Sequence, residues 1–112
     1  TLTPNGASGM VTCAADYARC VAAAIKNTEL RKEQIKMRPV LGWGLGWGIE
    51  RVGTREFLWQ WGDNGGYKNI VLAEPAREEA IFVFTNSDGG AKLYEWIVRN
   101  ATGIDHPAFL RL

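Results

Sequence analysis

Residues 59–72 read WQWGDNGGYKNIVL, and this stretch decides how the chain folds. A glycine-rich turn separates two runs of aromatic and β-branched residues, which is the pattern of two antiparallel strands joined as a hairpin. A hairpin needs only two turn residues such as Asn-Gly. The additional glycine and the neighbouring Trp59, Trp61 and Tyr67 therefore indicate a turn that is shaped around something else.

The composition indicates a soluble globular domain. The chain has 112 residues, which suits one domain with one core, and 46% of them are hydrophobic and 22% charged. The formal net charge is +1, without a long run of either sign, so we expect no nucleic-acid partner. The longest apolar stretch, 80–84, is far shorter than the ~20 residues that cross a bilayer, so we expect no membrane partner.

Three helices are predicted. The spacing of apolar residues favours a helix over 12–26, with Thr12 as its N-cap. A second helix over 29–37 is ended by Pro39. The last helix follows 86–90 and stops at Gly103. Its residues expected to face the sheet are Leu93, Trp96, Ile97 and Ala101.

The two cysteines are predicted to be buried thiols. Cys13 and Cys20 lie seven residues apart, which along a helix separates their Cα atoms by roughly 10.5 Å, beyond disulfide reach. Two cysteines and one distant histidine make a poor zinc site, so we expect no metal. Nothing in the sequence points to a cofactor.

Four segments have the pattern of strands. Residues 42–52 alternate glycine with large apolar residues, and this spacing excludes the GxGxxG dinucleotide motif. A strand whose bare face lets another element approach closely is the better interpretation. Further strands are predicted over 56–61, 67–73 and 80–85, the last two covered on both faces. Short connections predict a four-stranded antiparallel meander flanked by helices, an α+β fold in a single domain over 1–112.

Several motifs, in order, resemble those of one known family. GASGMVTCAADYARCV at 6–21 is similar to a loop and helix of the form GGLxSTAxDxARF, and GWGLGWGIE at 42–50 resembles a YGLGW strand. GDNGGYKNIVLAEPAREEAIFVFTNSDGG at 62–90 resembles a hairpin and exit of the form GGxxGFxSxxxxxPxxxxxVVVLTNSDNG. The chain thus resembles the C-terminal part of the serine β-lactamase and penicillin-binding-protein-like hydrolases, in the branch of class C (AmpC-type) β-lactamases, D-aminopeptidases and esterases.

The resemblance implies an active-site edge at Gln60, Trp61 and Gly62. They fall where the family has Lys-Thr-Gly or His-x-Gly, and the backbone N–H of Asp63 would help form an oxyanion hole. Gln60 departs from the pattern, because a neutral amide donates hydrogen bonds but supplies neither positive charge nor a proton-transfer group. Asp63 and Asn64 either hold a substrate or act as turn formers.

The resemblance also implies a nucleophilic serine in Ser-x-x-Lys and a Tyr-x-Asn motif, both earlier in the family's chain. Ser8 and Ser87 do not fit the first motif, and Tyr67-Lys68-Asn69 falls in the strand after the turn. No catalytic residue is therefore expected in this chain. It is expected to be the rear half of an acyl-transfer hydrolase whose N-terminal catalytic half is absent. Periplasmic or secreted location is suggested by the resemblance alone.

Two hypotheses follow. The first is a fragment or remnant of a hydrolase that acts on an ester, peptide or β-lactam and is inactive alone. The second is a non-catalytic binding or assembly module. In the family the strand that begins here at Ala80 and ends at Thr85 pairs with earlier strands, so its free edge predicts a homo-oligomer.

The tryptophans and the one histidine are expected to have structural roles. Trp43 and Trp47 are expected in the core, and Trp59 and Trp61 are more typical of core than of a pocket wall. His106 is expected to be a surface or packing residue rather than a general base.

Overall fold

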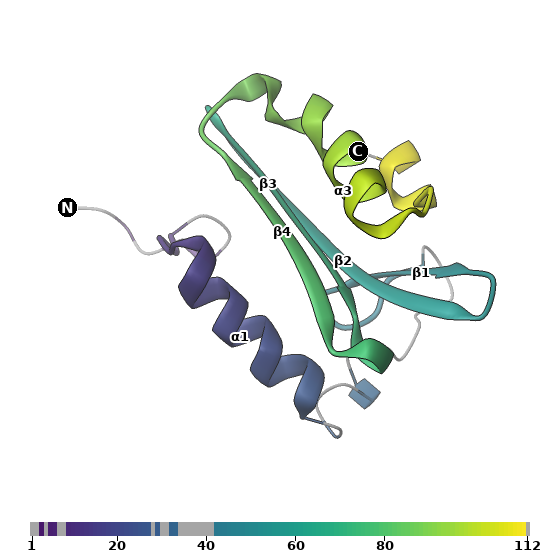
Figure 1. The fold of residues 1–112 in the computed structure, drawn as a ribbon. Coiled ribbons are helices and arrows are strands. Elements are labelled where there is room, and N and C mark those ends of the chain that lie inside the picture. The colour runs from purple at the N-terminus through teal and green to yellow at the C-terminus, as the bar shows by residue number, and fades with distance from the viewer. Residues whose placement is uncertain are drawn as a thin grey trace.

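The computed structural model describes residues 3, 5, 6, 9–27, 29, 32, 33 and 42–111. The helices and strands follow one another in the order α1 (Ala14–Lys26), β1 (Gly48–Val52), β2 (Arg55–Asn64), β3 (Tyr67–Glu74), β4 (Glu79–Thr85) and α3 (Ala91–Thr102) (Figure 1). Short 3-10 helices occur at η1 (Pro75–Arg77), η2 (Asp88–Gly90) and η3 (Pro107–Arg111). No helix within the described ranges is long and apolar enough to cross a membrane.

The four strands form one antiparallel sheet in the order β1-β2-β3-β4. The predicted meander and the α+β fold class are therefore confirmed. β4 lies at one edge of this sheet and β1 at the other. The predicted strands over 67–73 and 80–85 match β3 and β4 to within one residue at each end.

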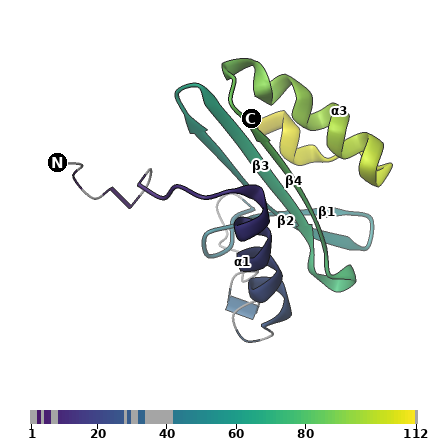
Figure 2. The same ribbon diagram turned by 60° about the vertical axis from the view of Figure 1, so that its left-hand side comes forward.

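Helices cover both faces of the sheet, with α1 on one side and α3 with η3 on the other (Figures 1 and 2). Side chains alternate along each strand, so every strand contributes to both layers. The cluster on the α1 side buries Val21, Ile25, Trp47, Ile49, Leu58, Val71 and Ala73. Two clusters on the α3 side bury Phe57, Trp59, Leu72, Val98 and Ala108, and Ile70, Val83 and Tyr94. β3 is thus covered on both faces, as its unbroken apolar run predicts.

The glycine-rich turn is shorter than the sequence suggests. β2 continues through Asn64, which pairs with Tyr67, so only Gly65 and Gly66 form the turn. Gly66 has a φ of 79°, which glycine adopts without strain, and its N–H donates to Asp88 Oδ1 at 2.8 Å. The residues expected to form a larger turn are therefore paired strand residues.

The predicted strand over 42–52 is wrong in its first half. Gly42 and Gly46 have φ values of 65° and 76°, which break an extended backbone. The chain instead loops so that Trp43 forms an isolated bridge with Gly48, where β1 begins. The expected close approach to a bare glycine does occur there, because a Cβ on Gly48 would overlap the indole of Trp59.

Helix α1 differs from its prediction in its cap and in its buried face. It begins at Ala14 with Cys13 as N-cap, and the Thr12 hydroxyl donates to the Cys13 carbonyl rather than capping the helix. Val21 and Ile25 are the residues buried against the sheet. Cys13 and Cys20 are exposed, so the predicted burial of both thiols is wrong. The helix predicted over 29–37 lies outside the described residues except at 29, 32 and 33.

Helix α3 ends at Gly103 as predicted, with a φ of 70° and an N–H that donates to the Arg99 carbonyl at 2.8 Å. The prediction of which side of α3 faces the sheet is wrong, because the helix is rotated about its axis by a fraction of a turn from the expected orientation. Tyr94 and Val98 are the buried residues, whereas Leu93 and Trp96 are 49% and 66% exposed. Of the four residues expected to face the sheet, Ile97 does so and Ala101 is exposed.

Replacing Gly48 with alanine is expected to lower the free energy of unfolding by about 1–3 kcal/mol, because the added methyl displaces the buried Trp59 indole. Urea denaturation followed by tryptophan fluorescence measures the change. Gly62→Ala is the matched control, since a Cβ at Gly62 in the neighbouring strand meets no atom within 4 Å. Equal stability of the two variants would contradict the predicted contact between Gly48 and Trp59.

Candidate functional site

The five candidate site residues lie together at the hairpin end of β2. Pairing with β3 sets Gln60 opposite Val71, Trp61 opposite Ile70, and Gly62 opposite Asn69. Because side chains alternate, Gln60 and Gly62 lie on the α1 side of the sheet, and Trp61 and Asp63 lie on the α3 side. The five residues are therefore consecutive in one strand, but their side chains are divided between the two faces of the sheet.

Gln60 carries a polar atom that needs a partner. Its Oε1 is buried and has no hydrogen bond within the described part of the chain. Leaving a buried acceptor unsatisfied costs about 1–3 kcal/mol, so a donor supplied by a bound molecule would be stabilising. The Gln60 amide is thus a hydrogen-bonding group and not a charged one.

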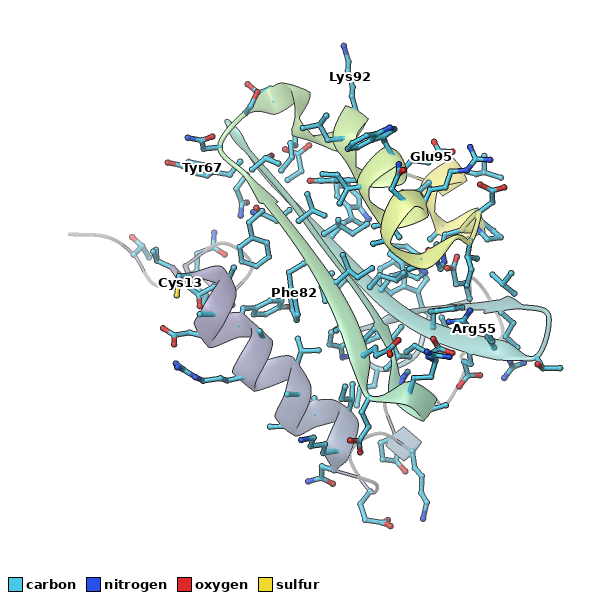
Figure 3. All side chains as sticks on the ribbon, viewed as in Figure 1. Cys13, Arg55, Tyr67, Phe82, Lys92 and Glu95 are labelled. Atoms are coloured by element: carbon cyan, nitrogen blue, oxygen red, sulfur yellow. The ribbon has the colours of Figure 1, made fainter. Side chains whose placement is uncertain are left out.

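Gly62 leaves space beside Gln60 on the same face. A Cβ added at Gly62 would meet no atom within 4 Å, so there is room beside the backbone at this point. Figure 3 places Tyr67, at the hairpin end, and Cys13, at the start of α1, on the same side of the molecule. Gly62 is half-buried, whereas Leu58, four residues earlier on the same face, is fully buried, so the sheet is less covered at its hairpin end.

On the opposite face, Trp61 is 40% exposed, so the interpretation of Trp61 as a core residue is wrong. Trp59 is buried, as expected for core. Asp63 forms an ion pair with Lys68 across the hairpin. Tyr94 from α3 has a buried hydroxyl with no hydrogen bond to any described residue, and burial together with the nearby Asp63 charge raises the pKa of Tyr94 to about 12.

These groups are suited to binding rather than to complete catalysis. An activated nucleophile is a hydroxyl or thiol that is hydrogen-bonded to a base such as an imidazole or an amine. The described hydrogen bonds around the hairpin end of β2 include no such pair. Within the described residues there is also no group of three or more His, Cys, Asp or Glu side chains arranged to hold a metal ion. What this end of the sheet offers is a backbone edge, a neutral amide and an exposed indole.

A buried polar cluster that no sequence motif indicates lies at the other end of the sheet. His106 Nδ1 is hydrogen-bonded to Glu50 Oε1, and Glu50 Oε2 accepts from the Ala108 N–H at 2.7 Å. The Thr102 hydroxyl lies 3.4 Å from His106 Nε2. The edge of the Phe57 ring packs at right angles to the imidazole, with ring centroids 4.8 Å apart.

This cluster anchors the C-terminal segment to β1. The packing interpretation of His106 is confirmed, since its side chain is wholly buried. Its partner Glu50 lies 56 positions earlier, so no local pattern could have revealed the pair. The Thr102 hydroxyl also donates to the Val98 carbonyl at 2.8 Å, which commits its proton within the helix and leaves it poorly placed as a nucleophile.

Comparison with known proteins identifies no relative: no family model, curated protein or solved structure matches the chain. The class of the protein is therefore defined by its architecture alone. It is an α+β domain in which one antiparallel sheet is held between α1 and α3, with candidate binding groups at the hairpin end of β2.

Replacing Glu50 with glutamine is expected to lower the free energy of unfolding by about 2–4 kcal/mol, because both Glu50 oxygens accept buried hydrogen bonds and an amide N–H2 would face a donor in place of one of them. The matched control is Arg51→Gln, which breaks the exposed ion pair with Glu56 and is expected to change stability by less than about 1 kcal/mol. Urea denaturation of both variants tests this difference. A Glu50 variant as stable as the Arg51 variant would mean that the pair with His106 does not anchor the segment.

Proposed function

We propose that this chain is the C-terminal part of a serine hydrolase of the β-lactamase-like type and that it has no hydrolytic activity by itself. The single observation that carries the proposal is the position of Gln60-Trp61-Gly62. These residues lie at the hairpin end of an antiparallel sheet that has helices on both faces, with the strand open beside Gly62. The order of the sequence motifs gives the reaction class by resemblance.

In the intact hydrolase the reaction would be acyl transfer from an ester, peptide or β-lactam to a serine and then to water. The serine, its lysine and the tyrosine would come from polypeptide outside this sequence. The backbone N–H of Asp63 would stabilise the negative charge that develops on the carbonyl oxygen. Gly62, without a side chain, would let the substrate approach the strand, and the Gln60 amide would hydrogen-bond to it.

The purified chain is expected to show no turnover of a chromogenic cephalosporin or of a p-nitrophenyl ester. The reason is that an amide and a backbone N–H can bind and polarise an acyl group but cannot attack it. Absorbance assays against a buffer blank and a heat-denatured sample measure this. Turnover above both controls that is lost in Gln60→Ala would overturn the proposed inactivity.

The DNA upstream of Thr1 separates the two hypotheses. An in-frame Ser-x-x-Lys and Tyr-x-Asn there would support a fragment of a hydrolase, whereas a start codon there would favour a non-catalytic assembly module.

A second candidate function is a non-catalytic assembly module that associates through β4. The observation in its favour is the place of β4 at the edge of the sheet, without a neighbouring strand on its outer side among the described residues. Phe82 and Phe84 of this strand pack against each other and against Tyr17, with ring centroids 6.0 and 5.7 Å from the tyrosine ring. An apolar edge of this kind is a template for pairing with another strand.

Light scattering at high protein concentration is expected to give twice the monomer mass of 12.4 kDa if β4 pairs with β4 of a second copy. Ala80→Lys places a charge on this edge strand and is expected to shift the population to monomer. Ala23→Lys, on the exposed side of α1, is the control and should leave the dimer intact. A monomer at every concentration would exclude the assembly through β4.

A further inference from the structure

A cavity of about 550 Å³ lies on the α3 side of the sheet, the face opposite Gln60 and Gly62. Its apolar lining includes Phe57, Leu72 and Ile81 from three strands, and Ala101 from the last turn of α3. The volume falls within the range of roughly 300–1,000 Å³ that is typical of small-molecule sites. The cavity is open to solvent on one side and its lining is mixed, with charged side chains of Arg55, Glu74, Arg77 and Glu79 beside the apolar residues, so it has the size and the amphipathic character to hold a small molecule with one polar end.

Two ion pairs border this apolar surface. Arg55 donates two hydrogen bonds to the two carboxylate oxygens of Glu74, one of them at 2.8 Å, and its guanidinium lies 5.2 Å from the centre of the Phe57 ring. Arg77 donates to both oxygens of Glu79, at 3.0 and 3.4 Å. Hydrogen bonds from Arg55 hold the pKa of the Glu74 carboxyl below its usual value, so that Glu74 stays charged and paired.

Each of the two arginines keeps N–H donors for a bound molecule. Both oxygens of each carboxylate already accept a hydrogen bond, whereas the Nη1 groups of Arg55 and Arg77 bond to no described residue. The two arginines are close together, since Arg77 Nε also lies 3.7 Å from Glu74 Oε2. Guanidinium groups with free N–H atoms bind carboxylates through charge-assisted hydrogen bonds.

We propose that this cavity binds a small organic monocarboxylate, with its hydrocarbon part against Phe57, Leu72 and Ile81 and its carboxylate on Arg55 and Arg77. A single negative charge fits best because Glu74 and Glu79 border the same space and would repel a dianion such as phosphate. A cation is disfavoured because Arg55 and Arg77 border the same space and would repel it. The proposal does not depend on the proposed hydrolase function, because the cavity lies on the other face of the sheet.

Octanoate is a suitable probe, with octylamine and 1-octanol as ligands of the same chain length but different charge. Calorimetric titration is expected to show saturable binding of octanoate and weaker or no binding of the other two. Amide resonances of Ala80, Ile81, Ala101 and Thr102 should shift with octanoate, while those of α1 should not.

Arg77→Gln is expected to weaken octanoate binding at least about fivefold, because it removes a charged donor. Arg77 is more than half exposed, so the variant should fold. Arg19→Gln is the control, since Arg19 lies on α1 in an exposed pair with Asp16 and should bind octanoate like the parent chain. The proposal would be overturned if octanoate showed no saturable binding, or if octylamine bound as tightly as octanoate. It would also be overturned if the Arg77→Gln and Arg19→Gln variants bound octanoate with equal affinity.

Discussion

The pairing of β2 with β3 through the Gly65-Gly66 turn is the constraint on which the rest of the structure depends. A two-residue turn fixes the register, and the register decides which side of the sheet each β2 residue faces. Leu58 is thereby directed into the cluster with α1, and Phe57 and Trp59 into the cluster with α3 and η3. A slip by one residue would direct Leu58 to the α3 side and Phe57 and Trp59 to the α1 side, so that neither cluster could pack as it does.

The same alternation determines what the hairpin end of β2 can do. It directs Gln60 to the face where the strand is open beside Gly62, and it sends Trp61 and Asp63 to the other face, near Tyr94. A substrate on the Gln60 side would therefore meet an amide and a backbone edge but neither Trp61 nor Asp63 as side chains. On the second face, α3 and the ion pairs of Arg55 and Arg77 border a separate cavity that is open to solvent on one side. One sheet thus presents two chemically different surfaces.

The sequence alone predicts the strands and the helices that follow local periodicity. β3 and β4 were found because their apolar runs are short and bounded by turn residues, and Gly103 marks the end of α3. The loop before β1 was missed because alternating glycines look like a strand until their positive φ values are known. The buried face of α3 was missed because Tyr94, which is amphipathic, takes the place that Leu93 or Trp96 was expected to fill.

Features made by residues distant in sequence could not be predicted. The Glu50–His106 pair and the Arg55–Glu74 pair join positions 56 and 19 residues apart, and no periodicity encodes either. Motif order predicts the five candidate site residues, but the division of their side chains between two faces depends on where the turn begins. That point is decided by the pairing of Asn64 with Tyr67, which the glycine-rich sequence leaves open.

The register of the hairpin can be measured directly by nuclear Overhauser contacts between backbone protons of β2 and β3. Contacts are expected between Gly62 and Asn69 and between Asp63 and Lys68, with Trp59 opposite Leu72 further along the strands. Contacts displaced by one residue, or a chain without cross-strand contacts over 62–66, would contradict both the two-residue turn and the assignment of Gln60 and Gly62 to the open face.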